Sequence, residues 1–201
     1  MSTPNRFASE VKTALSNVAW KVLSMPFEKV CRFVLVAAAA RMVGTAPFGR
    51  FRYATTLTLM LSFLMDLGLG LWTIRELARD RTRAATVTRT VLRVRILLGI
   101  PYLLATAVFA ALAAGETWTV ILLLGLAGLV SVLIDHAVAV FRGYERFRDE
   151  ARLNAARGVL VLGAALLGMW LRPSVLGLTA GTLGGTVAAG LYGVWIMRGQ
   201  Y

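Results

Sequence analysis

The sequence predicts an all-α membrane protein, a polytopic bundle of six transmembrane helices with both termini in the cytoplasm. Its 201 residues are 58% hydrophobic with a mean hydropathy of +0.70, which is too apolar for a soluble domain of this size. The apolar residues gather in blocks near the roughly 20 residues that a helix needs to cross about 30 Å of hydrocarbon. The Lys and Arg residues lie mainly between these blocks, as in proteins whose orientation in the membrane follows from charge.

Six apolar blocks define the predicted spans within a single membrane lobe over residues 1–201. They cover residues 18–43, 53–74, 94–114, 117–140, 155–171 and 174–197. The charged stretches 75–93 and 142–154 are expected to be cytoplasmic loops, and shorter breaks containing Pro47, Gly115 and Pro173 separate the other blocks. The first twenty residues lack the short apolar core and cleavage site of a signal peptide, so we expect insertion to use the first span itself.

The distribution of Lys and Arg predicts the orientation. With the N-terminus inside, fifteen of the 22 basic residues fall in cytoplasmic segments and four on the outer side. Because cytoplasmic loops are enriched in Lys and Arg, this asymmetry predicts that both termini are cytoplasmic, and it explains most of the net charge of +12. Attraction to anionic membrane lipids follows from the same charge.

Several classes of function are disfavoured. The single cysteine, Cys31, and the single histidine, His136, allow neither a disulfide nor a Cys/His zinc site. No phosphate-binding glycine loop is present, and no histidine is placed to activate a nucleophile. We therefore expect that the protein binds no cofactor and is not an enzyme. The stretch 75–93 contains no aromatic residue, which argues against nucleic-acid binding.

The first span carries a stripe of polar residues, which we take as the candidate substrate-binding face. The members recur at helical spacing, with Lys29 at the edge of the stripe. They are Asn17, Lys21, Ser24, Glu28, Lys29 and Arg32. A charge at the centre of a spanning helix costs about 2.5 to 3.5 kcal/mol on insertion scales, so the stripe is expected to face a wet interior.

Two interpretations of this stripe remain open. The cations line a cavity for an anionic substrate such as a phosphate or carboxylate. Alternatively, Lys21 reaches the cytoplasmic interface while Glu28, Lys29 and Arg32 form a structural salt-bridge cluster, in which Glu28 and Arg32 neutralise each other.

Polar faces also occur on the second and fourth spans. Thr55, Thr58, Ser62, Asp66 and Thr73 share about one third of the second helix, a face expected to line the same cavity. Asp66 is predicted either to pair with a cation of the first helix or to take up a proton as part of ion coupling.

In the fourth span, Gly128, Ser131 and Asp135 share a face, while His136 points about 100° away from Asp135. Asp135 and His136 are therefore candidates for ion coupling or for structural pairing. Small residues in the last two spans predict close helix packing. They are Gly158, Ala164, Ala165, Gly168, Gly177, Gly181, Gly184 and Ala188.

Four local patterns resemble the amino-terminal half of the polysaccharide and lipid-linked oligosaccharide flippases, within the multidrug/oligosaccharidyl-lipid/polysaccharide exporter superfamily. The patterns are Arg41 to Gly44 with Phe48-Gly49, Asp66 to Leu69, Arg75 to Arg79, and Phe141 to Glu145. The resemblance rests on the order and spacing of these patterns, and it covers nearly the whole chain.

The resemblance implies movement of a lipid-linked glycan to the outer leaflet of the cytoplasmic membrane by alternating access. It also implies two six-helix lobes around a cavity that is often cationic. Six spans correspond to one lobe, so we expect either a second half that continues the chain or a second copy related by a two-fold axis. The alternatives are a lobe of a cation-coupled multidrug exporter and a membrane scaffold that transports nothing.

Overall fold

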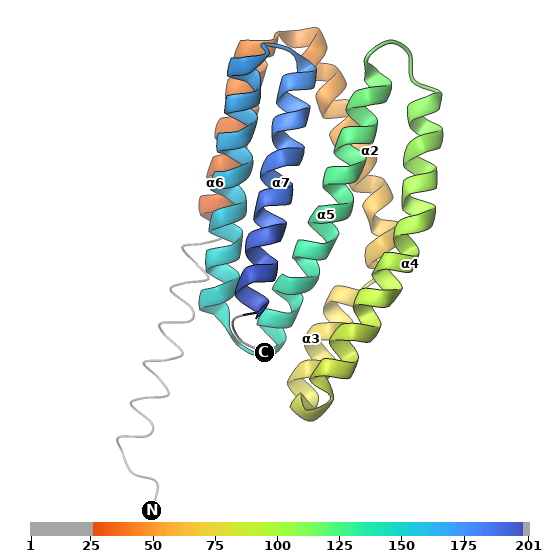
Figure 1. The fold of residues 1–201 in the computed structure, drawn as a ribbon, viewed down its shortest axis with the longest axis vertical. Coiled ribbons are helices and arrows are strands. Elements are labelled where there is room, and N and C mark those ends of the chain that lie inside the picture. Colours follow the sequence, from red (N-terminus) through yellow and green to blue (C-terminus); the bar gives the residue numbers. More distant parts are fainter. Residues whose placement is uncertain (1–25, 199–201) are drawn as a thin grey trace, which may run out of the picture.

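The computed structural model describes residues 26–198, and all regular structure within that range is helical. The first helix is described over residues 26–43. It is followed by α2 (Thr45–Asp66), α3 (Leu69–Arg79), the short 3-10 helix η1 (Arg81–Arg83), α4 (Ala84–Ala111), α5 (Thr117–Gly143), α6 (Phe147–Leu171) and α7 (Val175–Arg198). Figure 1 shows the long helices standing side by side. The all-α prediction is confirmed.

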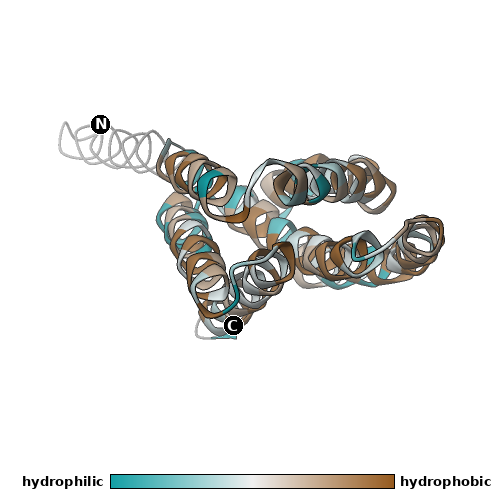
Figure 2. Ribbon diagram, turned by 90° about the horizontal axis from the view of Figure 1, so that it is seen from above, coloured by the Kyte–Doolittle hydropathy of each residue, from teal (hydrophilic) through white to brown (hydrophobic). Residues whose placement is uncertain are grey.

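The helices identify a multi-pass membrane protein. Within the described residues, four helices are long and apolar enough to span a membrane, and a fifth span is present if the bent pair α2 and α3 counts as one. Hydrophobic residues predominate along the helices, as the view from above shows (Figure 2). The prediction of six spans includes residues 18–25, which lie outside the described residues.

Both stretches predicted as cytoplasmic loops are mostly helical, and this corrects the sequence-based boundaries. In the stretch 75–93, α3 continues to Arg79 and α4 begins at Ala84. In the stretch 142–154, α5 continues to Gly143 and α6 begins at Phe147. Arginine is a good helix former, so charge alone does not end a helix that extends beyond the apolar layer. The connection at Asp80 is a tight turn in which its carboxylate accepts hydrogen bonds from the Thr82 hydroxyl and backbone N–H, and these lower the pKa of Asp80.

The second predicted span, 53–74, is interrupted. Leu67 and Gly68 adopt left-handed backbone conformations with φ of 38° and 80°, and α2 and α3 meet there at an angle of 41°. Gly68 adopts this conformation easily because it has no Cβ, and the Leu67 N–H caps α2 by donating to the carbonyl of Phe63. The break leaves Asp66 at the C-terminal end of α2.

The helix α5 occupies the centre of the bundle. It packs against α2, α3 and α4 and also against α6 and α7. Figure 1 shows α5 between the pair α6 and α7 on one side and α4 on the other. The arginine-rich connections at residues 80–83 and 144–146 lie at the same end of the bundle as the end of α7, and the connections at residues 112–116 and 172–174 lie at the opposite end. Connections rich in arginine and connections poor in arginine thus lie at opposite ends of the bundle, as the charge count predicts. The side of the membrane that each end faces stays a prediction.

The helices α6 and α7 pack almost backbone to backbone. A Cβ added at Gly168, Gly177, Gly181 or Gly185 would collide with the backbone of the facing helix. The sequence correctly predicts close packing for these two helices, but it assigns Gly184 to the face in place of Gly185. A Cβ at Gly184 meets no atom within 4 Å, because the contacting positions on α7 recur every four residues.

We expect Gly181→Leu to destabilise the protein, because the added side chain forces apart α6 and α7. Overpacking of this kind typically costs about 1 to 3 kcal/mol. Gly184→Leu, which makes the same change three residues away in open space, serves as the matched control. Thermal unfolding of the two purified variants measures the difference, and equal melting temperatures would contradict this account of the packing.

Candidate functional site

A cavity of about 240 Å³ lies among five helices. The first helix, α2, α5, α6 and α7 all contribute to its wall. Leu35, Phe51 and Leu124 line the cavity and also belong to the largest buried apolar cluster of the described residues. The cavity therefore lies directly against the apolar core and its polar side chains are held by packed helices.

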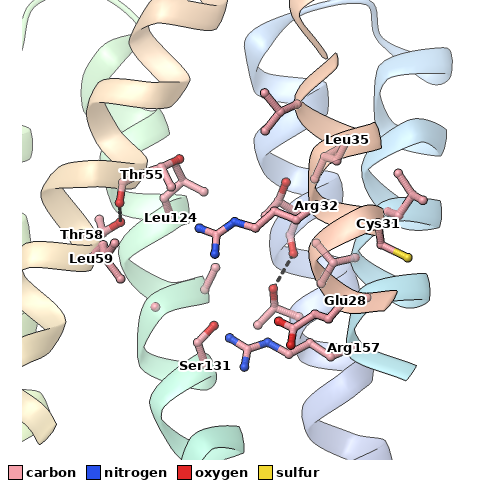
Figure 3. Close-up of a pocket in the computed structure, with 18 of the residues that line it drawn as sticks. Glu28, Cys31, Arg32, Leu35, Thr55, Thr58, Leu59, Leu124, Ser131 and Arg157 are labelled. Atoms are coloured by element: carbon pink, nitrogen blue, oxygen red, sulfur yellow. Dashed lines mark hydrogen bonds between the residues drawn. The ribbon is translucent and has the colours of Figure 1, made fainter. Parts of the chain in front are cut away.

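Three arginines give the cavity its charge. Arg32 comes from the first helix, Arg52 from α2 and Arg157 from α6. Figure 3 shows Arg32 and Arg157 extending into the cavity from the side of the first helix and α6 toward α2 and α5. Glu28 and Asp135 also line the cavity, so the lining residues within 26–198 include one more cation than anion.

The arginines differ in how their charges are balanced. Arg157 Nη1 donates a hydrogen bond of 2.8 Å to Asp135 Oδ1, and the two side chains are 21% and 55% exposed. Neither Arg32 nor Arg52 has an ion-pair partner within residues 26–198. Their guanidinium donors are therefore available to an anion that enters the cavity.

Threonine hydroxyl groups also line the cavity, and they share one hydrogen-bonding arrangement. Each of four threonine hydroxyls donates its hydrogen to a carbonyl one turn earlier in its own helix. These bonds join Thr55 to Phe51 (2.7 Å), Thr58 to Ala54 (2.9 Å), Thr182 to Leu178 (2.8 Å) and Thr186 to Thr182 (2.8 Å). Because the hydrogens are used internally, the oxygens offer acceptor lone pairs to a ligand. The cavity thus combines donors on arginines with acceptors on hydroxyls.

The structure places part of the predicted stripe in this cavity. Glu28 and Arg32 line it, whereas Lys29 is exposed and is not among the lining residues. Lys29 follows Glu28 by one residue and is rotated about 100° around the helix from it. The remaining members Asn17, Lys21 and Ser24 lie outside the described residues. No ion pair joins Glu28 to Arg32 among residues 26–198.

The polar faces predicted on the second and fourth spans also reach the cavity in part. Thr55, Thr58 and Ser62 line it, and so do Gly128, Ser131 and Asp135. Sequence reasoning missed Arg52 and Arg157, which it counted only as signals of orientation. Arg157 lies inside the predicted fifth span, so the rule that charges within a span avoid lipid was a signal that could have identified it.

Asp66 lies elsewhere, in an ion pair with the buried Arg95. Arg95 is 1% exposed, and its Nη2 lies 2.6 Å from Asp66 Oδ1. Its Nη1 donates a hydrogen bond of 2.7 Å to the carbonyl of Val132. Arg95 of α4 therefore holds α2 and α5 together. Asp66 thus pairs with a cation of α4 and with no described cation of the first helix, and its role in ion coupling stays a prediction.

His136 does not line the cavity either. It is 2% exposed on α5, and neither ring nitrogen has a hydrogen-bond partner within the described part of the chain. Asp135, its neighbour in sequence, lines the cavity. No group of three or more His, Cys, Asp or Glu side chains within residues 26–198 is arranged to hold a metal ion.

We expect Asp66→Asn to destabilise the protein by about 1 to 3 kcal/mol, because it removes the carboxylate that accepts from the buried Arg95 guanidinium. Arg95→Met should cost less, since it removes the buried charge and leaves only a half-exposed carboxylate. The double variant should recover most of the stability lost in Asp66→Asn. Thermal unfolding of the three variants in one detergent measures these differences, and additive losses would show that the pair does not interact.

Comparison with known proteins gives one result. Residues 14–201 match the family described as polysaccharide biosynthesis protein. No curated protein and no solved structure shows a significant match. The matched range includes all the helices that surround the cavity.

Proposed function

Because the chain belongs to the polysaccharide biosynthesis protein family, we propose that it is one lobe of a flippase for an anionic lipid-linked glycan precursor. Proteins of this family export or flip polysaccharide precursors and are generally not enzymes. The transported molecule would cross the cytoplasmic membrane by alternating access, with its charged headgroup in the cavity. Its lipid chain would remain in the bilayer.

The observation that supports this proposal most strongly is Arg32, which has no ion-pair partner within residues 26–198, in a cavity lined by hydroxyl acceptors. A lipid-linked glycan carries phosphate oxygens, which accept charge-assisted hydrogen bonds from guanidinium groups. It also carries sugar hydroxyls, which can donate to the threonine oxygens. The cavity offers both kinds of group within one site.

Cation-coupled drug export fits the cavity less well. That mechanism needs a carboxylate that takes up a proton or a metal ion. The two candidate aspartates are each paired with an arginine, and the third carboxylate, Glu28, lies in a cavity whose described lining holds more arginines than carboxylates. An anionic substrate, in contrast, matches the excess of positive charge among the lining residues.

A partner lobe is part of the proposal. The five helices that surround the cavity all belong to one lobe, and movement of the cavity between two sides of a membrane requires a second body against which this lobe can move. A second copy of the chain or a further half of the same protein would supply it.

The cavity predicts different roles for two neighbouring cations of the first helix. Arg32→Gln should abolish export of the surface glycan, because it removes the guanidinium that would receive the phosphate. Lys29→Gln, the matched control, should leave export nearly unchanged because Lys29 does not line the cavity. Cells that carry each variant in place of the native gene are assayed for surface glycan and for the amount of the protein in the membrane.

Equal loss of export in both variants would favour the whole polar stripe as the binding face. Loss of the protein from the membrane together with loss of export would favour the salt-bridge interpretation. Unchanged export in Arg32→Gln would support the scaffold function instead.

A further inference from the structure

Asp135 interacts with arginines from two different helices. Its carboxylate is ion-paired with Arg157 of α6 at 2.8 Å, inside the cavity. It also acts electrostatically on Arg95 of α4. Asp135 is 55% exposed, so its side chain has room to move, whereas Arg95 is fixed among packed helices.

Arg95 has capacity for a further acceptor. Its Nη1 and Nη2 donate to Val132 and Asp66, but its Nε is buried and has no hydrogen-bond partner among the described residues. The Val132 carbonyl lies on α5 one turn before Asp135, so the Arg95 guanidinium sits beside the same stretch of α5. A carboxylate at this place would receive a charge-assisted hydrogen bond.

An anion that binds Arg157 must compete with Asp135. The Arg157 side chain is 21% exposed and its Nη1 already donates to Asp135, so an entering phosphate shares the charge of this arginine with the carboxylate until the carboxylate moves away. A carboxylate left beside a bound phosphate would repel it. Displacement is therefore favourable only if a second cation receives Asp135.

We propose that Asp135 is an internal competitor that sets the affinity of the cavity for its anion, and that Arg95 receives its carboxylate when the anion binds. The inference rests on the proposed function and adds to it an affinity-setting residue and its second partner. Asp135 then remains paired in both states of the site, with Arg157 when the cavity is empty and with Arg95 when it is filled. Return of Asp135 to Arg157 favours release of the anion.

Binding of farnesyl pyrophosphate to the full-length protein tests the proposal. The protein is reconstituted in nanodiscs of phosphatidylcholine, a lipid without net charge, and equilibrium binding of the radiolabelled probe is measured. Asp135→Asn should tighten binding about fivefold, since a partly exposed ion pair contributes a free energy of that order. Glu116→Gln is the matched control, because it removes a negative charge from an exposed residue at the other end of α5 and should not change the affinity.

Two further variants test the roles of the arginines. In an Arg157→Gln background, Asp135→Asn should give no gain, because the arginine for which the carboxylate competes is absent. Arg95→Met should weaken binding while Asp135 is present and should have no effect once Asp135 is Asn. If Asp135→Asn fails to fold, Arg95→Met in the otherwise unaltered protein still tests the proposal, because unchanged binding there would overturn the role of Arg95.

Unchanged or weaker binding in a folded Asp135→Asn protein would overturn the competitor role. An equal effect of Arg95→Met with and without Asp135 would overturn the role of Arg95 as the second partner. The proposed function fails separately, when the unaltered protein does not bind the probe or when Arg32→Gln leaves its binding unchanged.

Discussion

Arginine side chains remain charged at any physiological pH, and inside an apolar layer each charge must be met by acceptors. This requirement organises the bundle around α5. Arg95 reaches α5 from α4 and donates to Val132, and Arg157 reaches it from α6 and pairs with Asp135. The central helix thus holds its neighbours on two sides by groups that are costly to leave unpaired.

The two sides of α5 are built differently. The helices α6 and α7 meet through glycines with their backbones in contact, which makes them a closely packed unit. On the other side, α2 is broken at Leu67 and Gly68, and its end is held to α4 by an ion pair. The cavity lies between a part secured by backbone packing and a part secured by polar contacts. In the proposed transport cycle, the polar contacts are those that can exchange partners.

The cavity keeps its hydroxyl hydrogens bonded within the helices while leaving acceptors and arginine donors open to a ligand. The threonine hydroxyls donate to their own helices, and their remaining lone pairs face the ligand space. The arginines there are compensated to different degrees, since Arg157 is paired and Arg32 has no ion-pair partner among residues 26–198. The affinity of such a site for an anion depends on competition from its own carboxylate as well as on direct contacts between the arginines and the anion.

The sequence by itself determined the helical membrane class, the family and most of the cavity faces, because hydrophobic period and helical spacing are local properties. Arg32, Ser62 and Asp135 lie where their positions around their helices predict. Tertiary structure alone decided the partners. Arg95 and Asp66 are 29 positions apart, and Arg157 and Asp135 are 22 apart, so no local pattern joins them. A charged residue in the sequence can be an orientation signal or a member of an ion pair. Only the packing of the helices around α5 shows which of the two roles each residue has.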